Sequence, residues 1–180
     1  MHTSHIPLIH QLLASAEKQN LPLWLESGWA IDALLHKITR EHDDIDLAFP
    51  IERQDQFLAI LQSFGSEKLE KTDYGFLVYV QGVLLDCEPC IQHGDNYELE
   101  DAPLNSCPWE KLGSIADIAV RCTSWEAILW EYFYYLDEVP KDSWRTKDFD
   151  SFEIVQKSLG QAKVKQLYMA FESTKNNLQA

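Results

Sequence analysis

The chain has 180 residues, of which 46% are hydrophobic, enough for one sizeable core or two smaller cores that share an interface. Its 29 acidic and 15 basic residues give a formal net charge of −14, which would repel nucleic acid and an anionic membrane surface. A cationic partner is the natural complement, although the same charge could serve only to keep the protein in solution.

Segments that would direct the protein out of the cytoplasm are not evident in the sequence. Residues 1–19 lack the basic stretch and apolar run of a secretory signal, and no apolar run approaches the roughly 18 residues that span a bilayer. Four cysteines are too few for a disulfide framework in a chain of this size. We therefore expect a cytoplasmic protein with free thiols at Cys87, Cys90, Cys107 and Cys122.

The first 65 residues alternate between helical and strand patterns of apolar side chains. Glycine and proline punctuate these patterns, as at the Ser27-Gly28 turn and at Pro50, where an alternating strand ends. The pattern predicts, in chain order, a helix over residues 6–19, a buried strand over 23–25, a helix over 29–35, a strand over 45–49, and a helix over 57–64 that Gly65 closes.

Two apolar runs follow, over residues 76–80 and 83–87. They are separated by Gln81-Gly82, the length of a tight hairpin loop, so we expect the two strands to pair antiparallel. Residues 88–113 are polar and contain three prolines, which predicts a long surface excursion over the first lobe.

The last third of the chain has a helical pattern. Residues 123–126 have the capping-box arrangement, with a hydroxyl at the cap and a carboxylate three residues on, which predicts the start of a helix. Two more helical patterns cover residues 147–159 and 162–173. We therefore expect a domain boundary that divides the chain into residues 1–122 and 123–180.

Two pairs of acidic residues lie on the predicted strands. Asp44 and Asp46 are two apart, so both project from one face of a strand while their apolar neighbours enter the core. Asp86 and Glu88 form a second pair by the same parity. An exposed polar face often carries such a pair, but if the two pairs converge in the fold, a site for a hard divalent cation such as Mg²⁺ is the simplest explanation.

Several residues could bind phosphate. Ser27-Gly28 lies where a strand passes into a helix, so its backbone amides could cradle a phosphate or could simply cap the helix. Arg40 and Lys147 could offset phosphate charge or could be solvated surface cations. His42, beside the acidic strand, is either a neighbour of the phosphates or an exposed loop histidine.

These motifs, in this order, resemble the nucleotidyltransferase superfamily that includes DNA polymerase beta, with a glycine-containing turn, an Asp-x-Asp strand and a third aspartate on a later strand. Within that superfamily the chain is similar to the aminoglycoside 2''-O-nucleotidyltransferases. The segments that carry this similarity are Leu23-Trp24-Leu25, residues 28–33, residues 42–47, Asp73-Tyr74-Gly75-Phe76-Leu77, Leu85-Asp86-Cys87-Glu88-Pro89, residues 124–128, Tyr132-Phe133-Tyr134-Tyr135 and residues 137–140.

The resemblance implies an α+β fold in which an N-terminal mixed β-sheet flanked by helices is joined to a C-terminal helical bundle, with the active site in the cleft between them. It implies that Asp44 and Asp46 bind Mg²⁺, that two Mg²⁺ ions are present, and that ATP is the co-substrate. Asp86 would be the catalytic base or a third metal ligand, and Ser27-Gly28 would face the triphosphate. One departure is that many relatives have glycines where this chain has Glu26 and Ser27, so that only Gly28 of the run is retained.

The resemblance further implies that AMP passes from MgATP to a hydroxyl, at the 2'' position, of an aminoglycoside antibiotic, with release of pyrophosphate and resulting resistance. Carboxylates and aromatic rings suit a cationic amino sugar. The expected substrate contacts are Tyr74, Glu88, Glu131, Tyr134 and Tyr135. Two alternatives stay open at this point, a lincosamide nucleotidyltransferase and a noncatalytic nucleotide-binding module.

Overall fold

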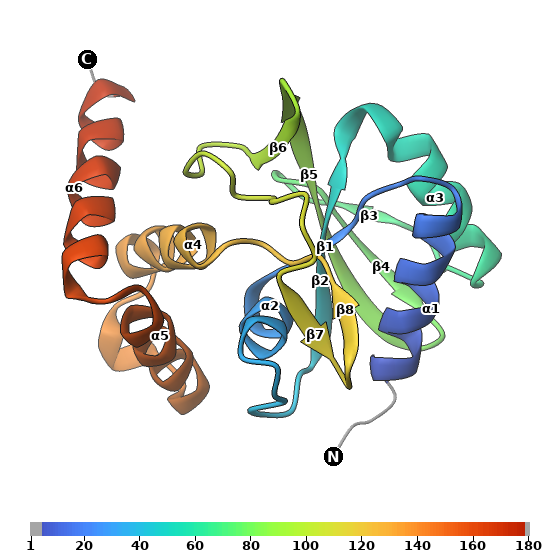
Figure 1. Ribbon diagram of the computed structural model, residues 1–180, viewed down its shortest axis with the longest axis horizontal. Coiled ribbons are helices and arrows are strands. Elements are labelled where there is room, and N and C mark those ends of the chain that lie inside the picture. Colours follow the sequence, from blue (N-terminus) through green and yellow to red (C-terminus); the bar gives the residue numbers. More distant parts are fainter. Residues whose placement is uncertain (1–4, 179–180) are drawn as a thin grey trace. The chain divides into compact units, whose positions relative to one another are not determined.

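The computed structural model describes residues 5–178 and contains two compact units, Met1–Thr123 and Ser124–Ala180. The N-terminal unit combines a mixed sheet with helices, and the C-terminal unit is helical (Figure 1). The α+β class expected from the sequence is therefore confirmed. No helix within residues 5–178 is both long enough and apolar enough to cross a membrane.

The elements of the N-terminal unit largely follow the predicted ranges. In chain order they are α1 (His5–Lys18), β1 (Trp24–Leu25), α2 (Ser27–Leu34), β2 (Asp44–Pro50), the short 3-10 helix η1 (Ile51–Arg53), α3 (Gln54–Ser63), β3 (Glu70–Lys71), β4 (Phe76–Val80), β5 (Val83–His93), β6 (Asn96–Leu99), β7 (Gly113–Ile115) and β8 (Ile118–Val120).

The main sheet has six strands in the order β1-β2-β5-β4-β3, with β6 paired to the far end of β5. β2 and β5 are parallel, and the other neighbours are antiparallel. The β4–β5 hairpin forms as predicted, because Gln81 and Gly82 both adopt positive φ, 53° and 78°, which suits a tight two-residue turn. β7 and β8 form a separate two-stranded sheet.

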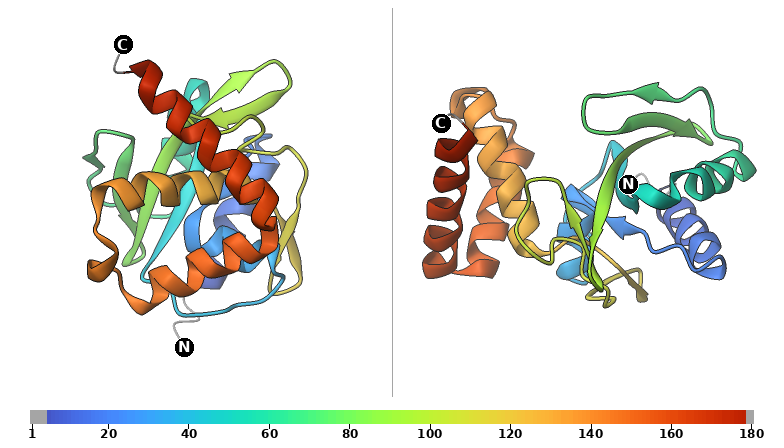
Figure 2. Two further views of the ribbon diagram at one scale, coloured as in Figure 1. Left: turned by 90° about the vertical axis from the view of Figure 1, so that its left-hand side faces the viewer. Right: turned by 90° about the horizontal axis from the view of Figure 1, so that it is seen from above.

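Helices cover both faces of the main sheet. α1 and α3 lie on one face and α2 on the other (Figures 1 and 2). The aromatic ring of Phe49 on β2 packs on Phe57 of α3, with 4.9 Å between centroids, and on Phe76 of β4 at 5.5 Å. Since side chains alternate along a strand, the face of β2 that carries Phe49 forms the core under α1 and α3, and the acidic residues of β2 project from the opposite face.

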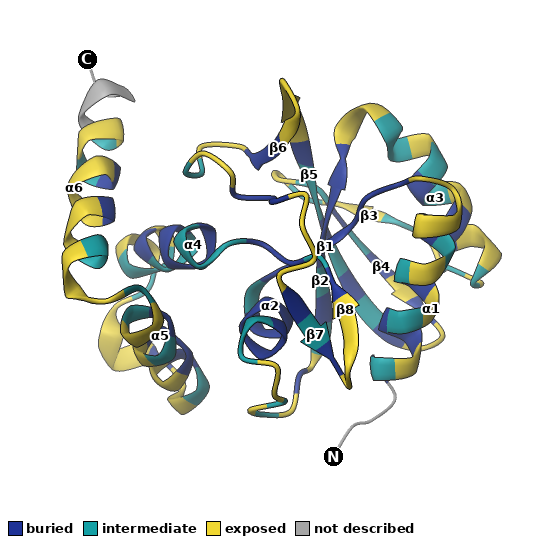
Figure 3. Ribbon diagram, in the orientation of Figure 1, coloured by how far each residue is buried: buried dark blue, intermediate teal, exposed yellow. Residues whose placement is uncertain are grey.

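The segment 88–113 is only partly the surface excursion that its polarity predicts: residues 91–96 and 109–112 are exposed, whereas 97–99 and 106–108 are buried. β5 continues through it to His93, and β6 returns antiparallel. Figure 3 shows buried ribbon at β6 next to the exposed tip of the hairpin. A second apolar cluster lies in this region, built from Trp24, Ala48, Cys90, Tyr97, Leu99 and Cys107. For the buried residues the prediction was wrong because the apolar residues in this segment are few and irregularly spaced, yet they meet Trp24, whose Nε1 donates to the carbonyl of Pro108 at 2.6 Å.

The C-terminal unit consists of α4 (Trp125–Glu138), the 3-10 helix η2 (Lys141–Ser143), α5 (Thr146–Leu159) and α6 (Gln161–Leu178). The three helices contact one another through an aromatic core, in which Phe171 of α6 meets Trp130 and Phe133 of α4 at 5.2 and 5.4 Å between centroids. Gly160 separates α5 from α6 at φ 77°, a conformation that favours glycine.

The N-terminal cap of α4 lies one residue later than the capping-box pattern predicts. Ser124 is the cap, and its Oγ accepts a hydrogen bond from the backbone N–H of Ala127 at 3.2 Å. Thr123 is fully buried, and its N–H donates to the carbonyl of Leu25 on β1 at 2.9 Å. The tertiary contact to β1 therefore holds Thr123 outside the helix, and the carboxylate of Glu126 pairs with Lys163 instead of capping.

All four cysteines are free and buried, as expected. Cys87 lies in the core face of β5, opposite the face that carries Asp86, and its side chain is fully enclosed. Burial therefore raises the pKa of the Cys87 thiol well above its ordinary value.

Candidate active site

The parallel pairing of β2 with β5 aligns three aspartates on one face of the sheet. Asp46 on β2 pairs directly with Asp86 on β5. Asp44 lies two residues earlier on β2 and pairs with Leu84. All three are half-buried, whereas the alternate residues Ile45 and Leu85 are fully buried on the other face. The structure thus brings together the two acidic pairs that the sequence placed on separate strands.

The electrostatic environment of Asp86 disfavours its charge. Burial raises the pKa of Asp86, and the nearby charge of Asp44 adds to this rise. Two hydrogen bonds oppose it, from the phenol of Tyr74, whose Oη donates to Asp86 Oδ2 at 2.8 Å, and from the backbone N–H of Cys87. The net shift is upward, so this carboxylate is more basic than an exposed aspartate.

Glu88 extends the acidic face along β5. Burial raises its pKa to about 7, with further contributions from the charges of Asp86 and Glu100. Carboxylates held this close repel one another unless a cation lies among them. The face is therefore chemically suited to a metal ion or to a cationic ligand.

Tyr74 reaches Asp86 from the loop before β4 because the backbone passes very close to β5 at Gly75. A Cβ on Gly75 would collide with the carbonyl oxygen of Cys87. Thr72 Oγ1 accepts a hydrogen bond from the Gly75 N–H at 2.9 Å and fixes this approach. Burial and the neighbouring Asp86 raise the pKa of Tyr74 to about 12, so its phenol stays a neutral donor at physiological pH.

The N-terminal end of α2 lies beside Asp46, because the N–H of Glu26 donates to the Asp46 carbonyl at 3.0 Å. Ser27 follows with φ 47°, in the region that favours glycine. The space that a Cβ of Gly28 would fill is occupied by the guanidinium of Arg40 and by the ring of His42, whose Nδ1 would be 2.8 Å away. Two basic side chains thus converge on a helix N-terminus, a favourable arrangement for phosphate.

His42 is not the exposed loop histidine that the sequence left open. Its ring is buried and stacks on Trp29, with 4.2 Å between ring centroids. Its Nε2 lies 2.7 Å from Oδ2 of Asp32, a fully buried carboxylate in α2. Sequence reasoning missed both Trp29 and Asp32, although an aspartate inside the apolar run of α2, four residues after Gly28, is a signal that a pattern search could use.

The acidic face fits Mg²⁺ by its donor chemistry. Within residues 5–178, no three His, Cys, Asp or Glu side chains converge closely enough to form a complete ligand set by themselves. Mg²⁺ usually takes only one or two carboxylates and completes its shell with water and phosphate oxygens. The hard oxygen donors of Asp44 and Asp46, beside a helix end suited to phosphate, meet that requirement.

Four of the predicted contacts belong to the C-terminal unit, and their roles stay predictions. Lys147 lies in the first turn of α5, and Glu131, Tyr134 and Tyr135 lie on α4. The two tyrosines have different neighbours within the unit. Tyr134 meets the ring of Phe171 edge-on at 4.8 Å, and Tyr135 meets Trp144 at 5.2 Å.

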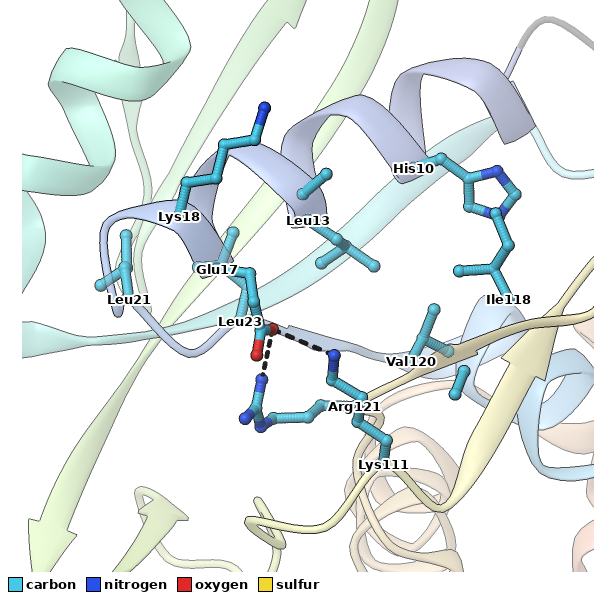
Figure 4. A pocket seen from close by; sticks show the side chains of 12 residues that line it. His10, Leu13, Glu17, Lys18, Leu21, Leu23, Lys111, Ile118, Val120 and Arg121 are labelled. Atoms are coloured by element: carbon cyan, nitrogen blue, oxygen red, sulfur yellow. Dashed lines mark hydrogen bonds and ion pairs between the residues drawn. The ribbon is translucent and has the colours of Figure 1, made fainter.

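A cavity of about 490 Å³ lies elsewhere in the N-terminal unit, between α1 and β8 (Figure 4). Its rim carries Glu17, paired with Arg121 at 2.9 Å and with Lys111 at 3.3 Å. Burial acts to raise the pKa of Glu17, but these two cations outweigh it and lower the pKa below its ordinary value. None of the predicted site residues lines this cavity, so we place the candidate site on the β2–β5 face.

Comparison with known proteins identifies the family of the chain. The family model described as aminoglycoside-2''-adenylyltransferase matches residues 8–156. A 2''-aminoglycoside nucleotidyltransferase of Escherichia coli is 50% identical over 173 residues, which cover 96% of this chain and 98% of that protein. A second protein of the same name, from Klebsiella pneumoniae, matches with the same identity and coverage.

Solved structures agree with the sequence matches. The crystal structure of ANT(2'')-Ia in complex with adenylyl-2''-tobramycin superposes with a TM-score of 0.94 at 50% identity, covering 96% of this chain and 99% of that one. The lincosamide adenylyltransferase LnuA, in its lincomycin-bound crystal structure, has a TM-score of 0.61 at 20% identity over 82% of this chain and 94% of that one, a likeness of fold alone.

Proposed function

Because this chain belongs to the aminoglycoside 2''-adenylyltransferase family, we propose that it transfers AMP from MgATP to the 2'' hydroxyl of an aminoglycoside and releases pyrophosphate. The observation that carries the proposal is the alignment of Asp46 with Asp86 across two parallel strands, beside the N-terminal end of α2. This alignment supports the proposal because carboxylates that could bind a metal then lie beside a helix end that could bind phosphate.

Asp44 and Asp46 are the proposed ligands of Mg²⁺, with two ions expected as in the superfamily pattern. When bound, Mg²⁺ would neutralise charge on the phosphates of ATP. The backbone at Ser27-Gly28 would face the triphosphate, and Arg40 would add a cation on the same side.

Asp86 is the proposed general base. Its raised pKa makes it a better proton acceptor than an exposed aspartate, and the phenol of Tyr74 orients one of its oxygens. The proton of the acceptor hydroxyl would pass to Asp86 as the oxygen attacks the α phosphorus of ATP in line with the departing pyrophosphate. A noncatalytic nucleotide-binding module would have no need for this third carboxylate.

The acceptor side of the proposal rests on charge. Glu88 and Tyr74 border Asp86, and Glu131, Tyr134 and Tyr135 are the proposed contacts from the C-terminal unit. A polycationic aminoglycoside gains from several carboxylates, whereas a lincosamide, with about one ammonium group, gains little. A lincosamide resistance protein of Staphylococcus haemolyticus is 26% identical over 129 residues, covering 63% of this chain and 74% of that protein, so lincosamides remain the alternative acceptor class.

The cytoplasm is the proposed setting. The four cysteines are reduced and buried, as suits a reducing compartment, and ATP is abundant there. The net charge of −14 also argues against nucleic acid and anionic membranes as partners.

The deciding experiment measures pyrophosphate release with ATP and Mg²⁺ against kanamycin, gentamicin, tobramycin and lincomycin. We expect release with the aminoglycosides, a mass increase of one AMP on the product, and 2'' attachment by NMR. The KM for kanamycin should rise clearly with ionic strength, because exposed ion pairs are screened by salt. Glu88→Gln and Glu131→Gln should raise this KM more than either lowers kcat.

Each contrary outcome has a distinct meaning. Faster turnover of lincomycin than of kanamycin would reassign the acceptor and leave the nucleotidyltransferase chemistry intact. No release with any acceptor, alongside MgATP binding and an active control enzyme, would support the noncatalytic module.

A further inference from the structure

Asp32 is a charged group in a place where a charge is unfavourable. It lies in the second turn of α2, flanked by the buried side chains of Ile31 and Ala33, and none of its surface is exposed. An isolated carboxylate in such surroundings is strongly destabilising unless hydrogen bonds and a partner compensate it. The hydrogen-bond partners of Asp32 therefore indicate its role.

The two oxygens of Asp32 have separate partners. Oδ1 accepts hydrogen bonds from the backbone N–H and the hydroxyl of Thr39, at 3.0 and 2.5 Å, in the loop that leads to β2. Oδ2 accepts from Nε2 of His42 at 2.7 Å. Oδ1 therefore ties the loop to α2, while Oδ2 engages the ring of His42.

Three contacts fix the orientation of the His42 ring. Asp32 engages Nε2, Trp29 stacks on the ring face at 4.2 Å, and the neighbouring Cε1–Nδ1 edge lies over Gly28, where both atoms would be 2.8 Å from a Cβ. Nε2 is therefore directed toward Asp32, and Nδ1 lies on the side of Gly28. The same indole donates from Nε1 to the Asp44 carbonyl at 2.9 Å, so Trp29 couples the ring to the strand of the proposed metal ligands.

We propose that Asp32 is a positioning residue for the nucleotide, which acts through His42 and holds the Nδ1 edge of that imidazole over Gly28, where the triphosphate binds at the N-terminal end of α2. The proposal rests on the proposed function, because it assumes that a nucleoside triphosphate occupies this end of the helix. Carboxylates at metal sites orient the histidines that bind the metal by accepting a hydrogen bond from the other ring nitrogen. Asp32 would orient His42 toward the triphosphate in the same way.

The test compares Asp32→Asn with Thr39→Val, a change that removes the other side-chain partner of the same carboxylate. Both variants loosen the loop, but only Asp32→Asn alters the group that faces His42. We expect Asp32→Asn to weaken binding of a nonhydrolysable ATP analogue with Mg²⁺ about tenfold, measured by calorimetry, and to raise the KM for ATP similarly. kcat and the aminoglycoside KM should change less than about twofold, and Thr39→Val should leave analogue affinity within about twofold of the parent.

A double-mutant cycle tests whether Asp32 acts through His42. His42→Asn should lose about as much analogue affinity as Asp32→Asn, and the double variant should lose no more than His42→Asn alone. Additive losses would overturn the proposal, because they would mean independent roles. Equal losses in Thr39→Val and Asp32→Asn would also overturn it, since loop anchoring would then explain the effect.

NMR of the parent protein keeps the proposal testable if Asp32→Asn does not fold. A ¹⁵N histidine correlation spectrum should show Nε2 protonated in His42 without ligand and a change at Nδ1 when the ATP analogue is added with Mg²⁺. An unchanged Nδ1 signal would overturn the proposal. Failure of the parent to bind any nucleotide would instead overturn the proposed function itself, which distinguishes the two failures.

Discussion

The acidic residues of the β2–β5 face and those of the C-terminal unit have opposite surroundings. On the β2–β5 face, burial and the charge of Asp44 raise the pKa of Asp86. In the C-terminal unit, partial burial acts to raise the pKa of Asp148, but hydrogen bonds from the Arg145 side chain and backbone outweigh it and lower the pKa. Other acids of that unit also pair with lysines, as Glu153 does with Lys157 at 2.8 Å.

The difference separates carboxylates that support function from carboxylates that support the fold. Paired acids such as Asp148 stabilise the helical unit by themselves. The acids on the β2–β5 face repel one another, so their unfavourable free energy is relieved only when a cation binds. Replacing an aspartate with asparagine should therefore raise the free energy of unfolding on the metal-free β2–β5 face and lower it in the C-terminal unit.

The largest expected effect is on catalysis by Asp86→Asn. The variant keeps the shape of the side chain but cannot accept the proton, so kcat should fall by about 10² to 10⁴-fold. MgATP affinity should change little, because Asp44 and Asp46 remain. Asp95→Asn, the same change at an exposed turn, is the control and should leave kcat unaltered. Near-normal turnover of Asp86→Asn would remove Asp86 from the base role.

The next effect concerns metal-dependent nucleotide binding. Asp44→Asn removes a proposed metal ligand, so the affinity for MgATP should fall about tenfold or more. In metal-free buffer the same variant should be slightly more stable than the parent, by up to about 1 kcal/mol, because a repulsive charge is gone. Thermal denaturation with and without Mg²⁺ measures both effects. A metal-free variant that melts below the parent would contradict the repulsion argument.

Asp148→Asn should have the opposite effect on stability. It breaks the capping interaction with Arg145, so unfolding should become easier by roughly 1 kcal/mol at neutral pH. Because the folded-state pKa lies below its ordinary value of 3.8, the advantage of the parent is fully present above that value and is lost as the pH falls through the folded-state pKa. Urea denaturation at pH 7 and near pH 3 should show this gap closing, and a gap that widens in acid would be inconsistent with it.

The smallest effect is expected for Tyr74→Phe. The change removes the hydrogen bond of 2.8 Å to Asp86 and leaves the ring in place. A neutral donor to a carboxylate contributes about 1 kcal/mol, so kcat/KM should fall roughly three- to tenfold. Tyr79→Phe, an exposed tyrosine on β4, is the matched control. An effect of Tyr74→Phe as large as that of Asp86→Asn would mean that the phenol itself takes part in proton transfer.

The sequence by itself determined the α-helices, the strands β1 and β2 and the β4–β5 hairpin, but not β3, β6, β7 or β8. Alternation along β2 placed Ile45 and Leu47 in the core and Asp44 and Asp46 on the other side, and the structure agrees. The Gln81-Gly82 turn fixed the β4–β5 hairpin, and Gly160 marked the end of α5. These features depend on neighbours within a few residues, so a local pattern contains them.

Tertiary structure alone decided which distant residues meet. The register that sets Asp46 beside Asp86 depends on parallel pairing between strands that are far apart in the chain, and no local period specifies it. The buried residues of segment 88–113 pack against Trp24, and the proposed role of Asp32 depends on the side chain of His42, which lies over α2. Periodicity can mark an aspartate inside an apolar run, but it does not identify the partners that stabilise the buried carboxylate, because only the folded chain brings them within hydrogen-bonding distance.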